Sequence, residues 1–427
     1  MVLLIQHGTV VNPAGKSGAL DILVEDGKVV AIEPKINEEF FSTFNDVQII
    51  DAKDCVVAPG LVDVHVHFRD PGFTYKEDII TGAEAAKAGG FTTVIMMANT
   101  DPAIDNVETL EYVLDKGSKT GIKVKSCANI TQGMKGLELT DMEALLKSGA
   151  VGFTDDGSPI LDEAVLREAM HKAKQLDVLL SFHEENPAYI LSSGFNHGEA
   201  SKQLNVGGAD RLAEIRMIER DIKYALITKA KINIQHISTT EGVELVRQGK
   251  MQGGYIFAEA TPHHFSLTEE DVVRYGTYAK MNPPVRTEMD RQAIIAGLSD
   301  GTIDMIATDH APHTEEEKSR GVELAPSGII GLETSLGLGV TKLVRSGALS
   351  MDQLITRMSY NPAKIYGLEA GILEIGKPAD IVVFNANKSW SVPSRFASKA
   401  SNSPFIGWEL YGKVEYTICN GEIVYSA

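Results

Sequence analysis

The chain has 427 residues, of which 43% are hydrophobic and 23% are charged, and its formal net charge is −18. This ordinary composition excludes collagen-like, intrinsically disordered and disulfide-scaffold proteins. The acidic balance argues against nucleic acid or an anionic membrane as the main partner, because both require a basic surface. An anionic small molecule would therefore have to be bound by a few local cations.

Three cysteines, Cys55, Cys127 and Cys419, are widely spaced along the chain. They provide neither a disulfide framework nor a CxxC zinc site, which is typical of a reducing compartment. The first residues, MVLLIQHG, form a short apolar run without a basic segment, and they predict a β-strand rather than a signal peptide. No stretch approaches the roughly 20 apolar residues of a membrane span. We therefore expect a cytoplasmic protein.

Both ends of the chain are predicted to form strands. Residues 1–33 contain strand-like runs joined at Asp26-Gly27, and the last segment contains runs joined at Asn420-Gly421. These dipeptides favour two-residue hairpin turns. Because an isolated hairpin is only marginally stable, we expect residues 1–57 and 367–427 to form one small β-sandwich-like domain. Separate terminal extensions are the alternative.

The middle of the chain alternates short apolar runs with segments of helical periodicity. The eight apolar runs are VVAPGLVDVHVHF, TTVIMMANT, KVKSCANI, AVGFTDDG, VLLSFHEEN, INIQHIS, GYIFAEATPHH and IDMIATDHAPH. Eight such alternations predict parallel strands with right-handed crossovers, and eight strands close a barrel. A doubly wound open sheet is the alternative, but the first run is not followed by GxGxxG. We therefore predict an α/β protein with a TIM-type (β/α)8 metallo-hydrolase barrel at residues 58–366.

Polar residues gather where these predicted strands end. They are His65, His67, Asn99, Asn129, Asp155, Asp156, His183, His236, His263, His264 and Asp309. A barrel brings the C-terminal ends of its strands to one face, and enzymes with this fold build their active sites there. We therefore expect these side chains to lie close together.

Alternate residues of the first run, Asp63, His65, His67 and Arg69, are predicted to point the same way, with the intervening valines facing the helices. Two converging imidazoles suit a cation such as zinc. A hydrogen-bonded pair of structural histidines is the alternative for an HxH motif.

His183, His236 and Asp309 extend this pattern to a two-metal site. A buried carboxylate such as that of Asp309 costs several kcal/mol unless it is protonated, hydrogen-bonded or bound to a cation. Two metal ions about 3.5–4 Å apart need an anionic group between them. Some barrel hydrolases use a carbamylated lysine of the fourth strand, but AVGFTDDG offers none. Asp155 or Asp156 is left as the bridge, and their spacing does not choose between them.

Several motifs together resemble those of the dihydroorotases of the longer bacterial type, in the amidohydrolase superfamily. The motifs are APGLVDVHVHFRDPG, GGFTTVIMMANT, GFTDDG, TPHHF, KMNPPVR, DGTIDMIATDHAPHT and NPAKIYGL. The resemblance implies two zinc ions per subunit. The implied metal ligands are His65, His67 and Asp309 for one ion, His183 and His236 for the other, and Asp156, the acid directly before glycine, as the bridge. These ligand types would also accept manganese or cobalt.

The resemblance further implies the reversible ring closure of N-carbamoyl-L-aspartate to (S)-dihydroorotate plus water, the third step of pyrimidine biosynthesis. Asp309 would be the catalytic acid and base in both directions. The implied substrate contacts are His67, Arg69, Asn99, Asn282, His313, Ser327 and Gly328. Arg69 suits a bidentate contact with a carboxylate, and a salt bridge to Asp70 or Glu77 is the alternative.

Two other functions are weighed against this one: another cyclic amidohydrolase, such as a hydantoinase or allantoinase, and an inactive structural subunit. The first class typically carries the bridging lysine, and the second would have lost ligands that this sequence retains. We expect a homodimer from the frequency of symmetric dimers and the habit of the family. An association with aspartate transcarbamoylase is left open. The charged segment 313–331 is predicted to be a lid beside the barrel mouth.

Overall fold

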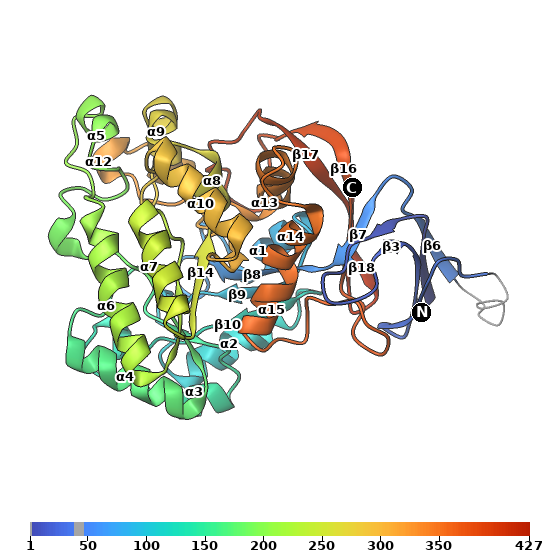
Figure 1. The fold of residues 1–427 in the computed structure, drawn as a ribbon, viewed down its shortest axis with the longest axis horizontal. Helices are drawn as coiled ribbons and strands as arrows, with labels where there is room; N and C mark the ends of the chain where they lie inside the picture. The colour runs from blue at the N-terminus through green and yellow to red at the C-terminus, as the bar shows by residue number, and fades with distance from the viewer. Residues whose placement is uncertain (1, 38–46) are drawn as a thin grey trace.

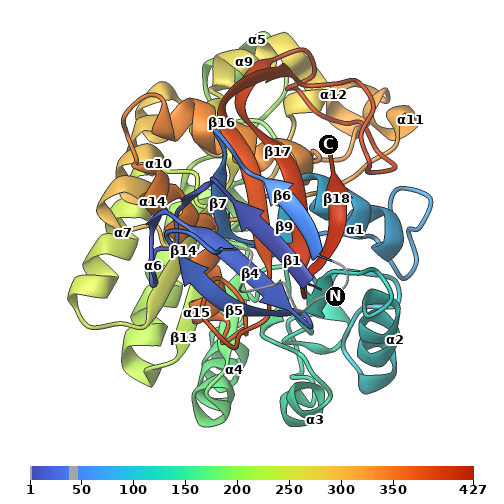
Figure 2. The same cartoon turned by 90° about the vertical axis from the view of Figure 1, so that its right-hand side faces the viewer.

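The computed structural model of the protein describes residues 2–37 and 47–427. It contains a helix-covered barrel and, beside it, a group of strands in which both ends of the chain lie (Figure 1). Turned by 90°, the same structure presents these terminal strands in front of the barrel (Figure 2). None of the helices in the described ranges is long and apolar enough to cross a membrane.

Eight strands form the barrel. They are β8 (Leu61–Val66), β9 (Phe91–Met96), β10 (Lys123–Ser126), β11 (Phe153–Thr154), β12 (Leu179–Phe182), β13 (Lys231–Ile234), β14 (Ile256–Ala260) and β15 (Met305–Ile306). Strands β8–β10 and β11–β15 form two parallel sheets. Parallel bridges between Ala128 and Phe153 and between Val66 and His310 join these sheets into a ring. The predicted eight-stranded barrel is therefore confirmed.

Helices cover the outside of this ring and fill the loops at its mouth. The helices between consecutive strands are α1 (Ile79–Ala88), α2 (Val107–Gly117), α3 (Met142–Lys147), α4 (Glu163–Leu176), α6 (Leu212–Thr228), α7 (Thr240–Met251) and α10 (Glu288–Asp300). Short helices in the loops are α5 (Glu199–Gln203), α8 (Pro262–Ser266), α9 (Glu269–Tyr275), α11 (Glu315–Lys318) and α12 (Gly321–Leu324). The chain leaves the barrel through α13 (Leu332–Leu338), α14 (Met351–Ile355) and α15 (Asn361–Ile365).

The sequence of α4 explains how such a helix forms and packs. Asp162 caps its first turn by accepting hydrogen bonds from the backbone N–H groups of Ala164 and Val165. Leu166, Ala169, Met170 and Ala173 of this helix are buried, and their spacing places them on one face. The apolar face packs on the barrel while the polar residues between face solvent.

Strands from both ends of the chain pair in one sheet, as predicted. Its order is β18-β17-β16-β7-β2-β3. The bounds are β2 (Thr9–Val10), β3 (Gly18–Ala19), β7 (Val56–Pro59), β16 (Ile381–Ser391), β17 (Glu409–Cys419) and β18 (Glu422–Ser426). A second sheet has the order β5-β4-β1-β6, with β1 (Val2–Gln6), β4 (Asp21–Glu25), β5 (Lys28–Glu33) and β6 (Val47–Asp51). Both predicted hairpin turns are present, whereas the division into 1–57 with 367–427 and 58–366 stays a prediction.

The alternation predicted for the first barrel strand is wrong in one place. Val66 packs in the large cluster that includes the covering helices, but Val64 packs with apolar residues of β9 and β15. The pairing of β8 with β9 is irregular between Asp63 and Val66. A β-bulge of this kind shifts the alternation of side chains by one residue. Asp63 accordingly accepts hydrogen bonds from the backbone N–H groups of His65 (3.0 Å) and Thr308 (3.2 Å).

Candidate metal centre

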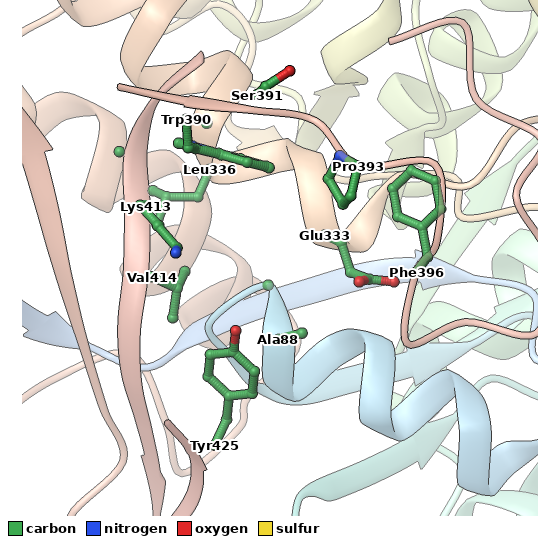
Figure 3. Close-up of a pocket in the computed structure, with 13 residues that line it drawn as sticks. Ala88, Glu333, Leu336, Trp390, Ser391, Pro393, Phe396, Lys413, Val414 and Tyr425 are labelled. Carbon is green, nitrogen blue, oxygen red and sulfur yellow. The ribbon is translucent and has the colours of Figure 1, made fainter. Parts of the chain in front are cut away.

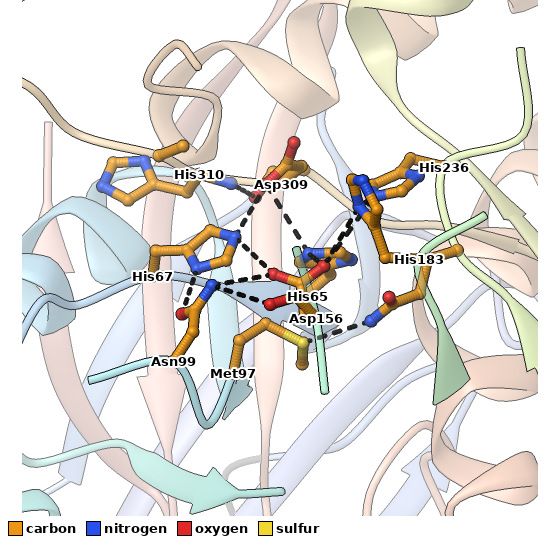
Figure 4. A network of polar contacts seen from close by, with 12 residues as sticks. His65, His67, Met97, Asn99, Asp156, His183, His236, Asp309 and His310 are labelled. Atoms are coloured by element: carbon orange, nitrogen blue, oxygen red, sulfur yellow. Dashed lines mark hydrogen bonds and ion pairs between the residues drawn. The ribbon is translucent and has the colours of Figure 1, made fainter. Parts of the chain in front are cut away.

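Four imidazoles and two carboxylates converge at the C-terminal ends of the barrel strands (Figure 4). They belong to His65, His67, Asp156, His183, His236 and Asp309, and all six side chains are buried. Two groups of potential ligand atoms share Asp156: one contains His65 and His67, and the other contains His183 and His236. The predicted strand-end residues are thus brought together, although Asp309 lies outside both groups, with its Oδ1 atom 3.6 Å from His65 Nε2 and 2.9 Å from His67 Nε2.

The distances between Asp156 and the four imidazoles fit bound cations better than direct hydrogen bonds. Its Oδ1 atom lies 3.7 Å from His65 Nε2, 3.5 Å from His183 Nδ1 and 3.9 Å from His236 Nε2, and its Oδ2 atom lies 3.5 Å from His67 Nε2. Tetrahedral zinc, with ligand distances of about 2.0–2.2 Å, places neighbouring ligand atoms about 3.3–3.6 Å apart. His65 Nε2 is also buried without a hydrogen-bond partner in the described part of the chain. The cluster is compatible with a metal site.

The imidazoles are oriented by acceptors on their other ring nitrogens. His65 Nδ1 donates to Glu259 Oε1 (2.8 Å), and His183 Nε2 donates to Glu185 Oε2 (3.1 Å). Such contacts fix the tautomer, so that the remaining nitrogen offers its lone pair to a cation. Neither glutamate is among the site residues predicted from the sequence. Glu259, a lone buried carboxylate in the apolar run IFAEA, could have been found by the argument that identified Asp309.

Asn99 orients the remaining histidine of the first strand. Its Oδ1 accepts from His67 Nδ1 (3.0 Å), and its Nδ2 donates to Asp156 Oδ2 (3.1 Å). The amide therefore bridges an imidazole and the shared carboxylate. This contact exists in addition to the substrate contact predicted for Asn99.

The charges of the cluster suit cation binding. Burial by itself would raise the pKa of Asp156, but the neighbouring imidazoles, with His65 first, hold that pKa well below its ordinary value. Burial likewise opposes ionisation of Asp309, but the hydrogen bond from His67 and the charge of His65 lower its pKa below the ordinary range. Against its burial, contacts with Asp156 and Glu185 raise the pKa of His183 to about 10. Protons and cations therefore compete for this imidazole.

Of the two acids that the spacing left open, Asp156 faces the cluster and Asp155 does not. Asp155 accepts hydrogen bonds from the backbone N–H groups of Ile130 (2.9 Å) and Thr131 (3.2 Å) and from the Thr131 hydroxyl. It therefore ties the loop after β10 to the end of β11.

Three other strand-end residues lie outside both ligand groups. Asn129 Nδ2 donates to the carbonyl of Thr154 (3.2 Å), and His264 Nε2 donates to the carbonyl of Pro283 (3.0 Å). Burial lowers the pKa of His263 to about 3, so this imidazole is neutral. Asn129 and His264 thus support loops around the mouth.

A pocket of about 190 Å³ opens beside the cluster. The predicted substrate contacts that line it are His67, Arg69, Asn99, Asn282, His313, Ser327 and Gly328. Asp309 and Asp156 line the same pocket. The predicted substrate contacts therefore line one pocket beside the cluster, and their contact with a substrate stays a prediction.

The guanidinium of Arg69 lies in this pocket and forms no ion pair with a carboxylate in the described ranges. Its Nε donates to the carbonyl of Pro312 (3.4 Å). The alternative of a salt bridge to Asp70 or Glu77 is wrong, because Asp70 pairs with Lys116 (2.5 Å) and Glu77 contacts His310 (3.5 Å). The guanidinium is therefore available to an anionic ligand.

His313 stands beside this guanidinium as a neutral hydrogen-bond donor. Burial, together with the positive charges of Arg69 and Lys76, lowers its pKa to about 2. Its Nε2 donates to the carbonyl of Ser327 (2.9 Å), while its Nδ1 accepts from Lys76 Nζ (3.4 Å). The rim of the pocket is locally basic although the whole chain is acidic.

The segment that follows His313 is fastened by a buried ammonium group. Lys318 Nζ donates to the carbonyls of Pro326 and Gly328, each at 2.9 Å. Asn402 Nδ2 also donates to the Gly328 carbonyl (3.1 Å). These bonds fix the backbone on both sides of Ser327, and the movement of this segment as a lid stays a prediction.

Three residues of the site have left-handed backbone conformations. The φ angles are 60° at Arg69, 30° at His236 and 49° at Asp309. Such angles are uncommon outside glycine and concentrate at functional sites. They turn each side chain at the end of a strand, a feature that strand periodicity does not reveal.

Comparisons with known proteins identify the family of the chain. The profile of the amidohydrolase family matches residues 56–424. The chain belongs to the amidohydrolase family. Within this class it is 55% identical to the dihydroorotase of Clostridioides difficile (strain 630) and 51% identical to that of Streptococcus pneumoniae serotype 4, in each case over 100% of both chains. The predicted resemblance is confirmed.

The solved structures of two hydantoinases share the fold. The L-hydantoinase (dihydropyrimidinase) from Arthrobacter aurescens superimposes with a TM-score of 0.86 at 26% identity, covering 99% of this chain and 96% of that one. A D-hydantoinase superimposes with a TM-score of 0.85 at 20% identity, covering 100% and 95% of the two chains. The second likeness concerns the fold alone.

Proposed function

We propose that the protein is a cyclic amide hydrolase that interconverts N-carbamoyl-L-aspartate and (S)-dihydroorotate plus water. The observation that carries this proposal is the placement of the unpaired guanidinium of Arg69 in the same pocket as the cluster around Asp156. In this arrangement the guanidinium can bind a substrate carboxylate while the cluster lies beside the ring amide that reacts. Full-length relatives named dihydroorotase support the same substrate.

The cluster would hold two zinc ions. His65, His67 and Asp309 would bind one ion, His183 and His236 the other, and Asp156 would contact both. When bound, such ions polarise a carbonyl group and make a water molecule more acidic. Glu259, Asn99 and Glu185 would keep the imidazole lone pairs directed at them.

The pocket residues bind and orient the substrate. Arg69 would contact the ring carboxylate through paired N–H groups, the geometry that a guanidinium provides. Asn282, His313 and the backbone of Ser327 and Gly328 would bind the remaining polar atoms. Because these groups converge from separate loops, the substrate is held in one orientation above Asp309.

Asp309 moves the proton. Its Oδ1 atom lies 2.9 Å from His67 Nε2 at the base of the pocket. In ring opening, the carboxylate takes a proton from the water that adds to the ring carbonyl carbon and gives it to the amide nitrogen as the C–N bond breaks. In ring closure, the Asp309 carboxylate takes the proton that the ureido nitrogen loses as it attacks the carboxyl carbon, and gives that proton to the carboxyl hydroxyl group, which leaves as water. One acid serves both directions, as microscopic reversibility requires.

The test is turnover of three cyclic amides by the purified protein. We expect hydrolysis of dihydroorotate and ring closure of N-carbamoyl-L-aspartate, without comparable turnover of hydantoin or allantoin. Preferred turnover of hydantoin would favour the activity for which the L-hydantoinase structure is named. Absence of turnover with every substrate after zinc addition would favour an inactive subunit.

Metal content tests the two-ion site separately. We expect about two zinc ions per chain, loss of activity on chelation and recovery on zinc addition. A content near one ion per chain would leave the pair His183 and His236 without its proposed role. The predicted homodimer is tested by light scattering, and the cytoplasmic location and any association with aspartate transcarbamoylase stay predictions.

A further inference from the structure

A second cavity, of about 320 Å³, lies between the barrel and the terminal sheet (Figure 3). It is bounded by the end of α1, by α13 and by strands β16, β17 and β18. It shares no lining residue with the pocket at the metal centre. Its role must therefore be read from its own side chains.

The cavity is left open because part of its wall consists of small residues, while larger side chains surround the rest. Ala88, Gly89 and Gly337 form part of its wall. A Cβ atom on Gly337 would lie 3.0 Å from Trp390 Cζ2, so the indole rests directly on this glycine. The flat indole face and the Phe396 ring then give the cavity an apolar interior suited to a planar group.

Three hydrogen-bond donors line this apolar space without partners. Trp390 Nε1 is buried and has no acceptor in the described ranges. Within the same ranges, neither Lys413 Nζ nor Tyr425 Oη has a hydrogen-bond or ion-pair partner. Figure 3 shows Lys413 and Tyr425 on one side of the cavity and Phe396 on the other. The Trp390 N–H group is buried, whereas Lys413 and Tyr425 are only half-buried. Their unpaired ammonium and hydroxyl groups favour a ligand rich in acceptors.

One acid faces these donors. The Glu333 carboxylate accepts hydrogen bonds from the backbone N–H groups of Ala397 (3.0 Å) and Ser398 (3.1 Å). Burial raises its pKa to about 7 despite these two bonds, and the nearby carboxylate of Glu77 contributes to the rise. Near neutral pH the carboxyl is therefore partly protonated and repels an anion less than an ordinary glutamate would.

We propose that this cavity is a second ligand site that binds a small planar organic acid. The acid group pairs with Lys413 and Tyr425, and the planar body lies between Trp390 and Phe396. The volume limits the ligand to about one ring with its substituents. The site is distinct from the proposed reaction and does not depend on it.

The experiment uses benzoate as the probe and calorimetry on the purified full chain. We expect saturable binding of benzoate that persists after the metals are chelated. Neutral benzamide should bind at least about tenfold more weakly than benzoate. Binding that disappears on chelation would place benzoate at the metal centre and overturn the proposal. Equal binding of benzoate and benzamide, or no saturable binding of benzoate, would overturn it as well.

Three variants locate the site. Lys413→Met should weaken benzoate binding about tenfold or more, because a charged hydrogen bond is lost. Lys388→Met is the matched control on the same hairpin, since Lys388 is exposed and pairs with Glu415. Ala88→Leu fills the cavity while keeping every charge, and it should abolish binding. Circular dichroism checks that each variant folds, and benzoate binding that is unchanged in folded Lys413→Met or Ala88→Leu protein would contradict the proposal.

Discussion

The two halves of the metal cluster differ in how well their imidazoles are held. In the first half, both His65 and His67 donate from Nδ1 to an acceptor, Glu259 and Asn99 respectively. In the second half, His183 has such an acceptor, but His236 Nδ1 is buried without one among the described residues.

The inner nitrogens of the second half also crowd each other, because His183 Nδ1 lies 3.0 Å from His236 Nε2. A ligand that is already oriented loses less freedom on binding, so the first half should bind its ion more tightly. Two groups with the same ligand types can therefore differ in how well their ligands are oriented.

Asp309→Asn should have the largest effect, because we propose that this acid both binds an ion of the first half and transfers the proton. We expect kcat to fall by about 10²–10⁴-fold in both directions of the reaction. Initial rates at saturating substrate measure the change, and thermal melting serves as the control for folding. A variant that keeps its full activity would show that another group transfers the proton.

Glu259→Gln and Glu185→Gln are matched variants that test the two halves of the cluster separately. Each change should weaken metal affinity about 10–100-fold, the usual cost of losing an orienting partner, but only for the half that it supports. Titration of the metal-free variants with zinc resolves the two sites. If both variants lost the same ion, the assignment of ligands to halves would be wrong.

Arg69→Lys tests the residue that extends the first half into the substrate pocket. Because lysine keeps the charge but loses the paired N–H geometry, we expect KM for dihydroorotate to rise about tenfold with a smaller change in kcat. Steady-state kinetics gives both values. Lys116→Arg is a suitable control, since Lys116 pairs with Asp70 outside the pocket. An unchanged KM would remove Arg69 from the carboxylate contact.

The order of metal loss should show the smallest effect. During slow chelation, the ion in the second half should leave several times faster than the ion in the first, because His236 lacks an acceptor for its outer nitrogen. Time-resolved metal analysis of dialysed samples follows both. Simultaneous loss would mean that the shared Asp156 governs both ions equally.

The sequence predicted those parts of the site that depend on strand ends. Because a barrel gathers the ends of its strands, His183, His236 and Asp309 could be placed beside His65 without coordinates. It did not predict Glu259 as the partner of His65, since that hydrogen bond links side chains of β8 and β14. Such pairing depends on side-chain directions rather than on spacing along one strand.

Two further features were beyond prediction for a similar reason. The bulge after Asp63 changes which way this acid points, and the left-handed backbone at His236 reorients a strand end; neither follows from an apolar pattern. The cavity beside Trp390 arises where segments about 300 residues apart in sequence meet around Gly337 and Ala88. Its outline depends on packing, which a linear pattern does not encode.

The two parallel sheets of the barrel are joined only by isolated bridges among the described residues, and an aspartate adds a hydrogen bond across each junction. Asp63 of β8 accepts the backbone N–H of Thr308 across one junction, and Asp155 after β11 accepts that of Thr131 across the other. The adjacent acids Asp155 and Asp156 thus have different roles. Asp155 joins the two sheets of the barrel, and Asp156 faces the candidate metal centre. The closure of the barrel and the proposed reaction therefore depend on two consecutive residues.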